Sequence, residues 1–168
     1  MISSREALRK LKADGWTRQE HPERDMLYHA RTTIDKRGRV EIDFPDCPGC
    51  QTFADADEDA VAVAREALDG WLEAHLVDGD APPQPSARPT RKGLAVPVSP
   101  ALAIALQVRW RRQELGLSQS QLGKKLGVTR QQVALLEQPT GNLKVSTLER
   151  IADALGVHLS VDLTPALL

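Results

Sequence analysis

The chain has 168 residues, of which 41% are hydrophobic and 27% charged, and its formal net charge at pH 7 is −1. This length is comfortable for two small domains. No stretch approaches the roughly 18 consecutive apolar residues of a membrane-spanning helix, and the charged N-terminus lacks the apolar core of a signal peptide. We therefore expect a cytoplasmic protein with no membrane span.

The charges are distributed unevenly along the chain. Residues 26–87 carry thirteen Asp/Glu against five Lys/Arg, a net charge of −8, and residues 88–168 carry five against eleven, a net charge of +6. Residues 1–25 have a net charge of +1. Segments of opposite sign favour two functions, a basic one suited to phosphates and an acidic one suited to a basic partner. A solvated acidic helix face is the alternative interpretation of the acidic segment.

Residues 1–25 are predicted to form an N-terminal helix followed by a linker. Ser3 and Glu6 have the spacing of a capping box, and the helix is expected to end near Gly15. The polar residues 17–25 then indicate a loop or linker.

Residues 26–80 are predicted to form a small domain of strands and one helix. Strand patterns over 27–34 and 40–44 flank a loop in which Gly38 supplies a positive φ, and a third short strand is expected at 51–53. Apolar residues then recur at helical spacing as far as Gly79, with Asp55 as the expected N-cap and Glu58 three residues later. The Pro-rich residues 81–93 are expected to be a stiff, exposed linker.

Residues 94–168 are predicted to form an all-α domain with a C-terminal strand. A short strand at 94–98 precedes a helix that starts at Ser99-Pro100, and a later capping box begins with Ser146. After Gly156, apolar and polar residues alternate over 157–163, which indicates a half-buried strand. That strand would pair with residues 94–98 or, across a two-fold axis, with a second copy. We therefore expect a homodimer or a tetramer.

Residues 117–137 carry the clearest functional signal. Ser118 with Gln121, and Thr129 with Gln132, have the spacing of two capping boxes, and Gly127 lies where the first helix must end in left-handed backbone. Two short helices joined by a tight turn are typical of a helix-turn-helix, whose second helix enters the major groove. The sequence therefore predicts binding to double-stranded DNA. The alternative interpretation is that the helix-turn-helix serves only as a dimerisation module.

The exposed start of the second helix carries residue types that read DNA bases. Arg pairs with guanine edges and Gln with adenine edges, whereas surface Lys contacts phosphates without sequence choice. Leu135 lies where related domains often carry a polar base-reading residue, so each subunit is expected to read few bases. The predicted DNA-binding residues are Gln119, Lys124, Thr129, Arg130, Gln131, Gln132 and Lys144, and Lys125 is a further phosphate candidate.

Cys47 and Cys50 form a C-x-x-C pattern that has three interpretations. It can be a redox pair, or half of a zinc site completed by His29 and His75. A redox pair normally lies at a helix N-terminus, whereas a strand is predicted to follow here. A turn with one or both thiols buried is therefore the simpler interpretation.

No catalytic constellation is legible in the sequence. There is no nucleophile triad and no phosphate-cradling glycine loop, and Asp35, Asp43 and Asp46 are expected at the surface rather than around a metal. We therefore expect no enzymatic activity, no cofactor and no metal.

Residues 40–67 carry several short motifs, and the linker carries two more. They are Phe44-Pro45-Asp46-x-Pro48-Gly49-Cys50, Thr52-Phe53, Ala60, Ala64 and Arg65-Glu66-Ala67-Leu68, then Gly79-Asp80 and Pro83-x-Pro85-Ser86. In these motifs the chain resembles the N-terminal domain of HicB-family antitoxins. The resemblance implies an α+β protein whose first domain is a partial ribonuclease-H-like fold without nuclease activity. In the family this domain binds HicA, a small mRNA-cleaving toxin.

Residues 94–163 resemble the Cro/repressor (XRE) type of helix-turn-helix, which one branch of these antitoxins carries. In the family this domain represses the operon that encodes toxin and antitoxin. The resemblance implies a type II antitoxin that neutralises a HicA-type toxin by direct binding and represses its own operon. The alternative is a stand-alone helix-turn-helix regulator that responds to a small ligand.

Residues 1–16 depart from the antitoxin pattern. They resemble the first helix of the HicA toxin in Ser4-Arg5-Glu6, Leu8, Leu11 and Asp14-Gly15-Trp16. The toxin's Gly-Ser-His segment does not follow, so its catalytic histidine is missing. We interpret residues 1–25 as a HicA-like remnant or as an over-extended start ahead of Met26.

Overall fold

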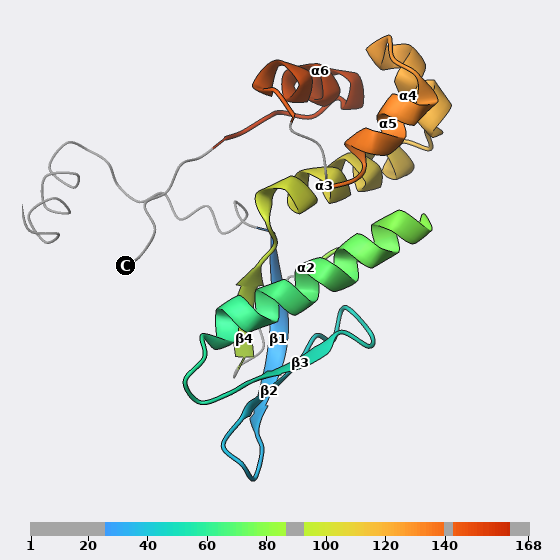
Figure 1. The fold of residues 1–168 in the computed structure, drawn as a ribbon. Helices are drawn as coiled ribbons and strands as arrows, with labels where there is room; N and C mark the ends of the chain where they lie inside the picture. Colours follow the sequence, from blue (N-terminus) through green and yellow to red (C-terminus); the bar gives the residue numbers. More distant parts are fainter. Residues whose placement is uncertain (1–25, 87–92, 140–142, 162–168) are drawn as a thin grey trace, which may run out of the picture.

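The chain has an α+β fold in which a four-stranded sheet and a long helix precede a group of shorter helices (Figure 1). The computed structural model describes residues 26–86, 93–139 and 143–161. The predicted N-terminal helix lies outside these ranges. No helix within them combines the length and apolar character that crossing a membrane requires.

The four strands form one antiparallel sheet in the order β3-β2-β1-β4. They are β1 (Leu27–Ile34), β2 (Val40–Asp43), β3 (Gln51–Ala54) and β4 (Gly93–Pro97). The β1–β2 loop turns at Gly38, whose φ of 82° confirms the predicted left-handed position. The Asp35 carboxylate stabilises this loop by accepting the backbone N–H groups of Arg37 and Arg39, at 2.7 and 2.9 Å.

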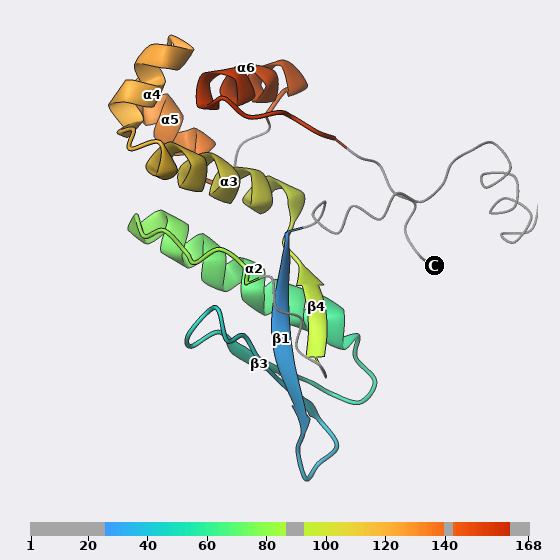
Figure 2. The same cartoon turned by 180° about the vertical axis from the view of Figure 1, so that it is seen from behind.

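The helix α2 (Ala60–Asp78) covers one face of the sheet (Figures 1 and 2). Its N-cap is Asp59, which accepts the backbone N–H groups of Val61 and Ala62, so the predicted cap at Asp55 is wrong. Asp55 instead donates its backbone N–H to Glu58 across a turn that precedes the helix. The helix buries Ala64, Leu68, Leu72 and Leu76, which pack with sheet residues that include Tyr28, Ala30, Ile42 and Val96. We call β1–β4 and α2 the sheet domain.

Strand β4 joins the sheet by pairing with β1, a partner that was not predicted. Tyr28 lies opposite Val96 and Ala30 lies opposite Leu94. Val96 is buried in the core beneath α2, so pairing with β1 buries an apolar side chain. The segment that was grouped with the helix-turn-helix by sequence therefore completes the sheet domain.

The helix α3 (Pro100–Glu114) contributes side chains to two cores. Leu102, Leu106 and Trp110 join the core of the sheet domain, whereas Val108 lies in a second core with the remaining helices. The two views show α3 between α2 and the helices α4–α6 (Figures 1 and 2). We call α3–α6 the helical domain.

Most described residues of the Pro-rich segment are exposed, but several of them are hydrogen-bonded to the protein. Pro82 is buried and its carbonyl accepts the indole N–H of Trp110 at 2.8 Å. The neighbouring carbonyl of Pro83 accepts the Tyr28 hydroxyl at 2.6 Å. These contacts hold residues 82–83 between β1 and α3.

The helical domain is completed by α4 (Gln119–Leu126), α5 (Arg130–Leu136) and α6 (Val145–Leu155). Their apolar faces meet in the second core, which consists of Val108, Leu122, Leu126, Val133, Ile151 and Leu155. The helix α6 begins one residue before Ser146, after Lys144, with no side-chain cap, so the predicted capping box there is wrong. Residues 157–161 form no strand, and the rest of the predicted C-terminal strand lies outside the described ranges.

Candidate nucleic-acid interface

The helices α4 and α5 have the backbone geometry of a helix-turn-helix. Both predicted capping boxes are confirmed: the hydroxyls of Ser118 and Thr129 each accept an N–H at 3.2 Å, from Gln121 and Gln132 respectively. The two Gln side chains accept the backbone N–H of the capping residue in return, at 2.7 and 2.9 Å. Gly127 ends α4 in left-handed backbone, with φ 67°. These local interactions fix the start of α5, the helix predicted to read bases.

A second glycine of the turn, Gly123, was not identified from the sequence. It is buried inside α4, and a Cβ built on it would lie 2.7 Å from the backbone carbonyl oxygen of Val128. Only glycine allows the turn to approach the helix this closely. A helix-interior glycine immediately before a turn is the pattern that could have revealed it.

The structure separates the predicted DNA-binding residues into two groups. Arg130 and Gln131 at the start of α5 are exposed, as are Lys124 on α4 and Lys144 before α6. The side chains of Thr129 and Gln132 are also exposed, but they make the capping box of α5. Arg130 and Gln131 are therefore the side chains of α5 best placed to reach base edges. Leu135, also on α5, is 58% exposed.

Gln119 occupies a different environment from the one predicted. It is half-buried, and its amide donates to the carboxylate of Glu137 at 3.1 Å. Glu137 is the C-cap of α5, is only 1% exposed, and also accepts two N–H groups of Arg112. The Nε of a second buried arginine, Arg109, lies 3.5 Å from the same carboxylate. This charged cluster joins α3, α4 and α5.

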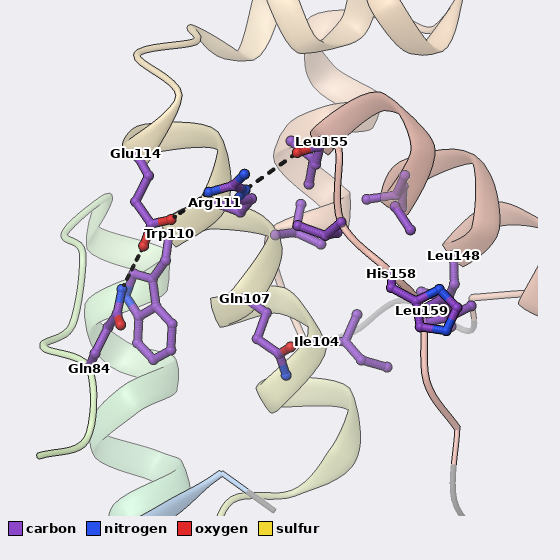
Figure 3. A pocket seen from close by; sticks show the side chains of 14 residues that line it. Gln84, Ile104, Gln107, Trp110, Arg111, Glu114, Leu148, Leu155, His158 and Leu159 are labelled. Atoms are coloured by element: carbon purple, nitrogen blue, oxygen red, sulfur yellow. Dashed lines mark hydrogen bonds and ion pairs between the residues drawn. The ribbon is translucent and has the colours of Figure 1, made fainter. Parts of the chain in front are cut away.

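A groove of about 320 Å³ lies on the side of α3 that faces α6 and the residues after it (Figure 3). Its lining is largely apolar and includes Ile104, Leu148 and Leu159, with Gln107 and His158 at its polar positions. At one end Gln84 donates to Glu114 at 3.1 Å, which joins the Pro-rich segment to α3. Arg111, which also lines the groove, pairs with Glu114 at 3.2 Å. The groove therefore belongs mainly to the helical domain and carries one ion pair at this end.

The face of the sheet opposite α2 is open. Phe53 is 50% exposed there, and the guanidinium of Arg39 lies 4.4 Å from the centre of its ring. Arg31, Glu41 and Asp43 line the same shallow depression. This face presents charges of both signs around one exposed aromatic ring.

Cys47 and Cys50 lie in the turn between β2 and β3, and both thiols are buried as predicted. Burial, with the Cys50 thiol and Asp46 nearby, raises the pKa of Cys47 to about 12. Burial and Asp43 raise the pKa of Cys50 to about 11. A reactive thiol requires a lowered pKa, so the geometry favours a packing role.

The candidate acid cluster is dispersed. Asp35 is engaged in the hairpin loop, and Asp46 accepts the backbone N–H and hydroxyl of Ser86, both at 2.9 Å. Within the described ranges no group of three or more His, Cys, Asp and Glu side chains is arranged to hold a metal ion.

Two family models match the chain. Residues 31–91 match the HicB-like antitoxin of bacterial toxin-antitoxin systems, and residues 108–161 match a helix-turn-helix family. The first match covers β2, β3, α2 and the second half of β1, and the second covers α4–α6 with the end of α3.

Curated relatives extend the comparison to most of the chain. Antitoxin HicB 2 of Photorhabdus laumondii is 26% identical over 138 residues, covering 82% of this chain and 96% of the relative. Antitoxin HicB 1 of the same organism is 26% identical over 141 residues, covering 83% and 88% respectively. An uncharacterized HTH-type transcriptional regulator of Sinorhizobium medicae is 39% identical over 57 residues, covering 34% of this chain and 41% of the regulator. The chain is therefore a homologue of the HicB antitoxins, in which a HicB-like antitoxin domain precedes a helix-turn-helix DNA-binding domain.

Proposed function

We propose that this chain is the antitoxin of a type II toxin–antitoxin pair. In this proposal it binds and neutralises a HicA-type mRNA-cleaving toxin, and it represses its own operon through the helix-turn-helix. It acts by binding and not by catalysis. The observation that carries the proposal is the exposed pair Arg130 and Gln131 at the start of a doubly capped helix-turn-helix, in a chain related to HicB antitoxins along most of its length.

The charge of the sheet domain supports a basic protein partner. Residues 26–87 carry a net charge of −8, and several acidic side chains of this segment are exposed, among them Asp57, Glu66, Glu73 and Asp78. A nuclease that binds RNA has a basic surface, and complementary charges speed the encounter of two proteins.

The helix-turn-helix would act on DNA as part of a dimer or tetramer. Two recognition helices related by a two-fold axis contact half-sites about one helical turn, roughly 34 Å, apart. Val157 and Val161 are 43% and 63% exposed after α6, and they belong to the alternating apolar pattern that we expect to pair between two copies. Substituting both by Ser should yield monomers in sedimentation velocity, and a dimer that persists unchanged would place the interface elsewhere.

The toxin half of the proposal is tested by co-expression. The full chain is produced with the product of the adjacent reading frame, and copurification and relief of growth arrest are measured. Capture of a small basic protein whose nuclease activity this chain suppresses supports the proposal. Failure to bind or neutralise that product refutes it.

The DNA half is tested with a duplex from the region upstream of the reading frame. Each base-reading contact contributes about 1–3 kcal/mol, so Arg130→Ala should weaken binding by at least about fivefold. Toxin neutralisation should survive, because Arg130 is exposed on the helical domain. Arg37→Ala is the matched control, since it removes the same charge from the hairpin at the far end of the molecule (Figure 1). Equal operator affinity for Arg130→Ala and the control would show that α5 does not read DNA.

A further inference from the structure

The residue that connects the two domains most directly is Arg109, in the middle of α3. Its side chain is buried, 8% exposed, and extends toward both domains. One terminal nitrogen, Nη1, donates to the carbonyl oxygens of Leu76 and Asp80, at 3.2 and 2.6 Å. These carbonyls lie at the C-terminal end of α2, where a positive charge is favourable to the helix dipole.

The other side of the same guanidinium faces the helix-turn-helix. Arg109 Nε lies 3.5 Å from Glu137 Oε2, close enough for an ion pair, yet this buried nitrogen makes no hydrogen bond to any residue that the structure describes. Buried donors are normally satisfied. The guanidinium thus donates two hydrogen bonds from Nη1 toward α2, whereas its Nε, which faces α5, has an ion-pair contact without a hydrogen bond.

Glu137 transmits this contact to the elements that face DNA. The oxygen opposite Arg109 also accepts the amide of Gln119, the first residue of α4, and an N–H of Arg112. Glu137 itself caps the C-terminal end of α5. A displacement of α5 or of Gln119 therefore changes the acceptor available to Arg109, and with it the hydrogen bonds at the end of α2.

We propose that Arg109 is a positioning residue that couples the recognition helix to the sheet domain, so that a protein bound to the sheet domain changes the affinity of α5 for DNA. Coupling of this kind is reciprocal: DNA bound to α5 changes the affinity for the protein partner by the same factor. This regulatory consequence rests on the proposed antitoxin function. The coupling itself is a property of the free chain and is tested without toxin or DNA.

The test perturbs the helical domain and measures the sheet domain. Gln119→Ala removes one donor from Glu137 and leaves a half-exposed site, which the fold tolerates. The freed oxygen should attract Arg109 Nε and draw the guanidinium away from Leu76 and Asp80. The reporters are the backbone amides of Gly79 and Asp80, which close α2 by bonding to Leu76 and His75.

Hydrogen exchange of these amides is followed by NMR in the full chain and expressed relative to amides in the sheet, which removes changes in global stability. Gln119→Ala should accelerate exchange at Gly79 and Asp80 on the order of threefold, the lower range for coupled residues. Lys124→Ala, on the exposed side of the same helix, is the matched control and should leave both amides unchanged.

Gln119→Ala is then combined with substitutions that remove the Arg109 guanidinium. In Arg109→Gln the effect of Gln119→Ala on Gly79 and Asp80 should disappear. Arg109→Lys is the second variant: it retains the charge, but a single ammonium cannot reach Glu137 and both carbonyls. Arg111→Gln controls for the loss of an arginine two residues away, which bonds to Leu155 and Glu114 of the helical domain, and it should preserve the effect.

Two results would overturn the proposal. One is that Gly79 and Asp80 do not respond to Gln119→Ala in the natural Arg109 background, a result that needs no Arg109 variant to fold. The other is an equal response with and without Arg109. Failure of the antitoxin proposal would appear separately, as loss of copurification or of operator binding.

Discussion

Replacing Glu137 by Gln removes the charge of the cluster beneath the recognition helix while nearly preserving side-chain volume. The carboxylate is 1% exposed, and both arginines beside it are at most 8% exposed as residues. An exposed ion pair contributes at most about 1 kcal/mol, whereas leaving a buried charge without its partner costs about 3–5 kcal/mol. Since Arg112 bonds this carboxylate through two nitrogens and Arg109 faces it as well, we expect a loss of about 3–5 kcal/mol in the free energy of unfolding.

Urea unfolding followed by tryptophan fluorescence and circular dichroism measures this loss. Trp110 lies in the core of the sheet domain on the helix shared with the helical domain, so its signal reports the junction of the two domains. The control is Glu149→Gln on α6, which removes the same charge from an exposed position and should change stability by less than about 0.5 kcal/mol. A loss below about 1 kcal/mol for Glu137→Gln would refute the argument that the buried charges depend on this carboxylate.

Four further outcomes are expected from buried groups of the fold. Gly123→Ala should destabilise the helix-turn-helix by about 1–3 kcal/mol, since its Cβ would lie 2.7 Å from the Val128 carbonyl; an unchanged urea midpoint would contradict this. The raised pKa values of Cys47 and Cys50, about 12 and 11, imply alkylation by iodoacetamide at pH 7.5 at least about a hundredfold slower than in the unfolded chain. These folded-state pKa values lie above the ordinary value of 9.0, so the protonated thiols favour folding below pH 9. That contribution to stability is lost as the pH rises toward 12. Equal labelling rates before and after unfolding would exclude both the slow alkylation and this pH dependence. A fragment of residues 99–161 should aggregate in light scattering, because it exposes the apolar side of α3, and a stable monomer would show that the sheet domain is dispensable.

Local interactions of the helix-turn-helix could be predicted from the sequence. Each capping box involves residues three apart, and Gly127 must follow the helix that it ends, so spacing alone places them. The alternation of Ile42 and Phe44 with acidic residues likewise identifies these two buried side chains without knowledge of their partners.

The errors concern contacts between distant segments. Strand β4 pairs with β1 across more than sixty residues, and no local pattern distinguishes that edge from the C-terminal one. The helix α3 carries apolar residues on two sides, and its contribution to the core of the sheet domain was not predicted from the sequence. Arg109, Arg112 and Glu137 have the residue types of an exposed surface, and only their mutual pairing allows burial.

The double contribution of α3 limits how such chains can be recombined. A crossover in the Pro-rich segment would separate Pro82 from Trp110, and a crossover after α3 would pair foreign apolar residues with Val108. A chimera that exchanges DNA specificity should therefore keep the native scaffold and graft only the exposed residues of α5. Homologues that acquired a new operator preference are expected to differ at those surface positions while retaining the α3 residues that contact α2.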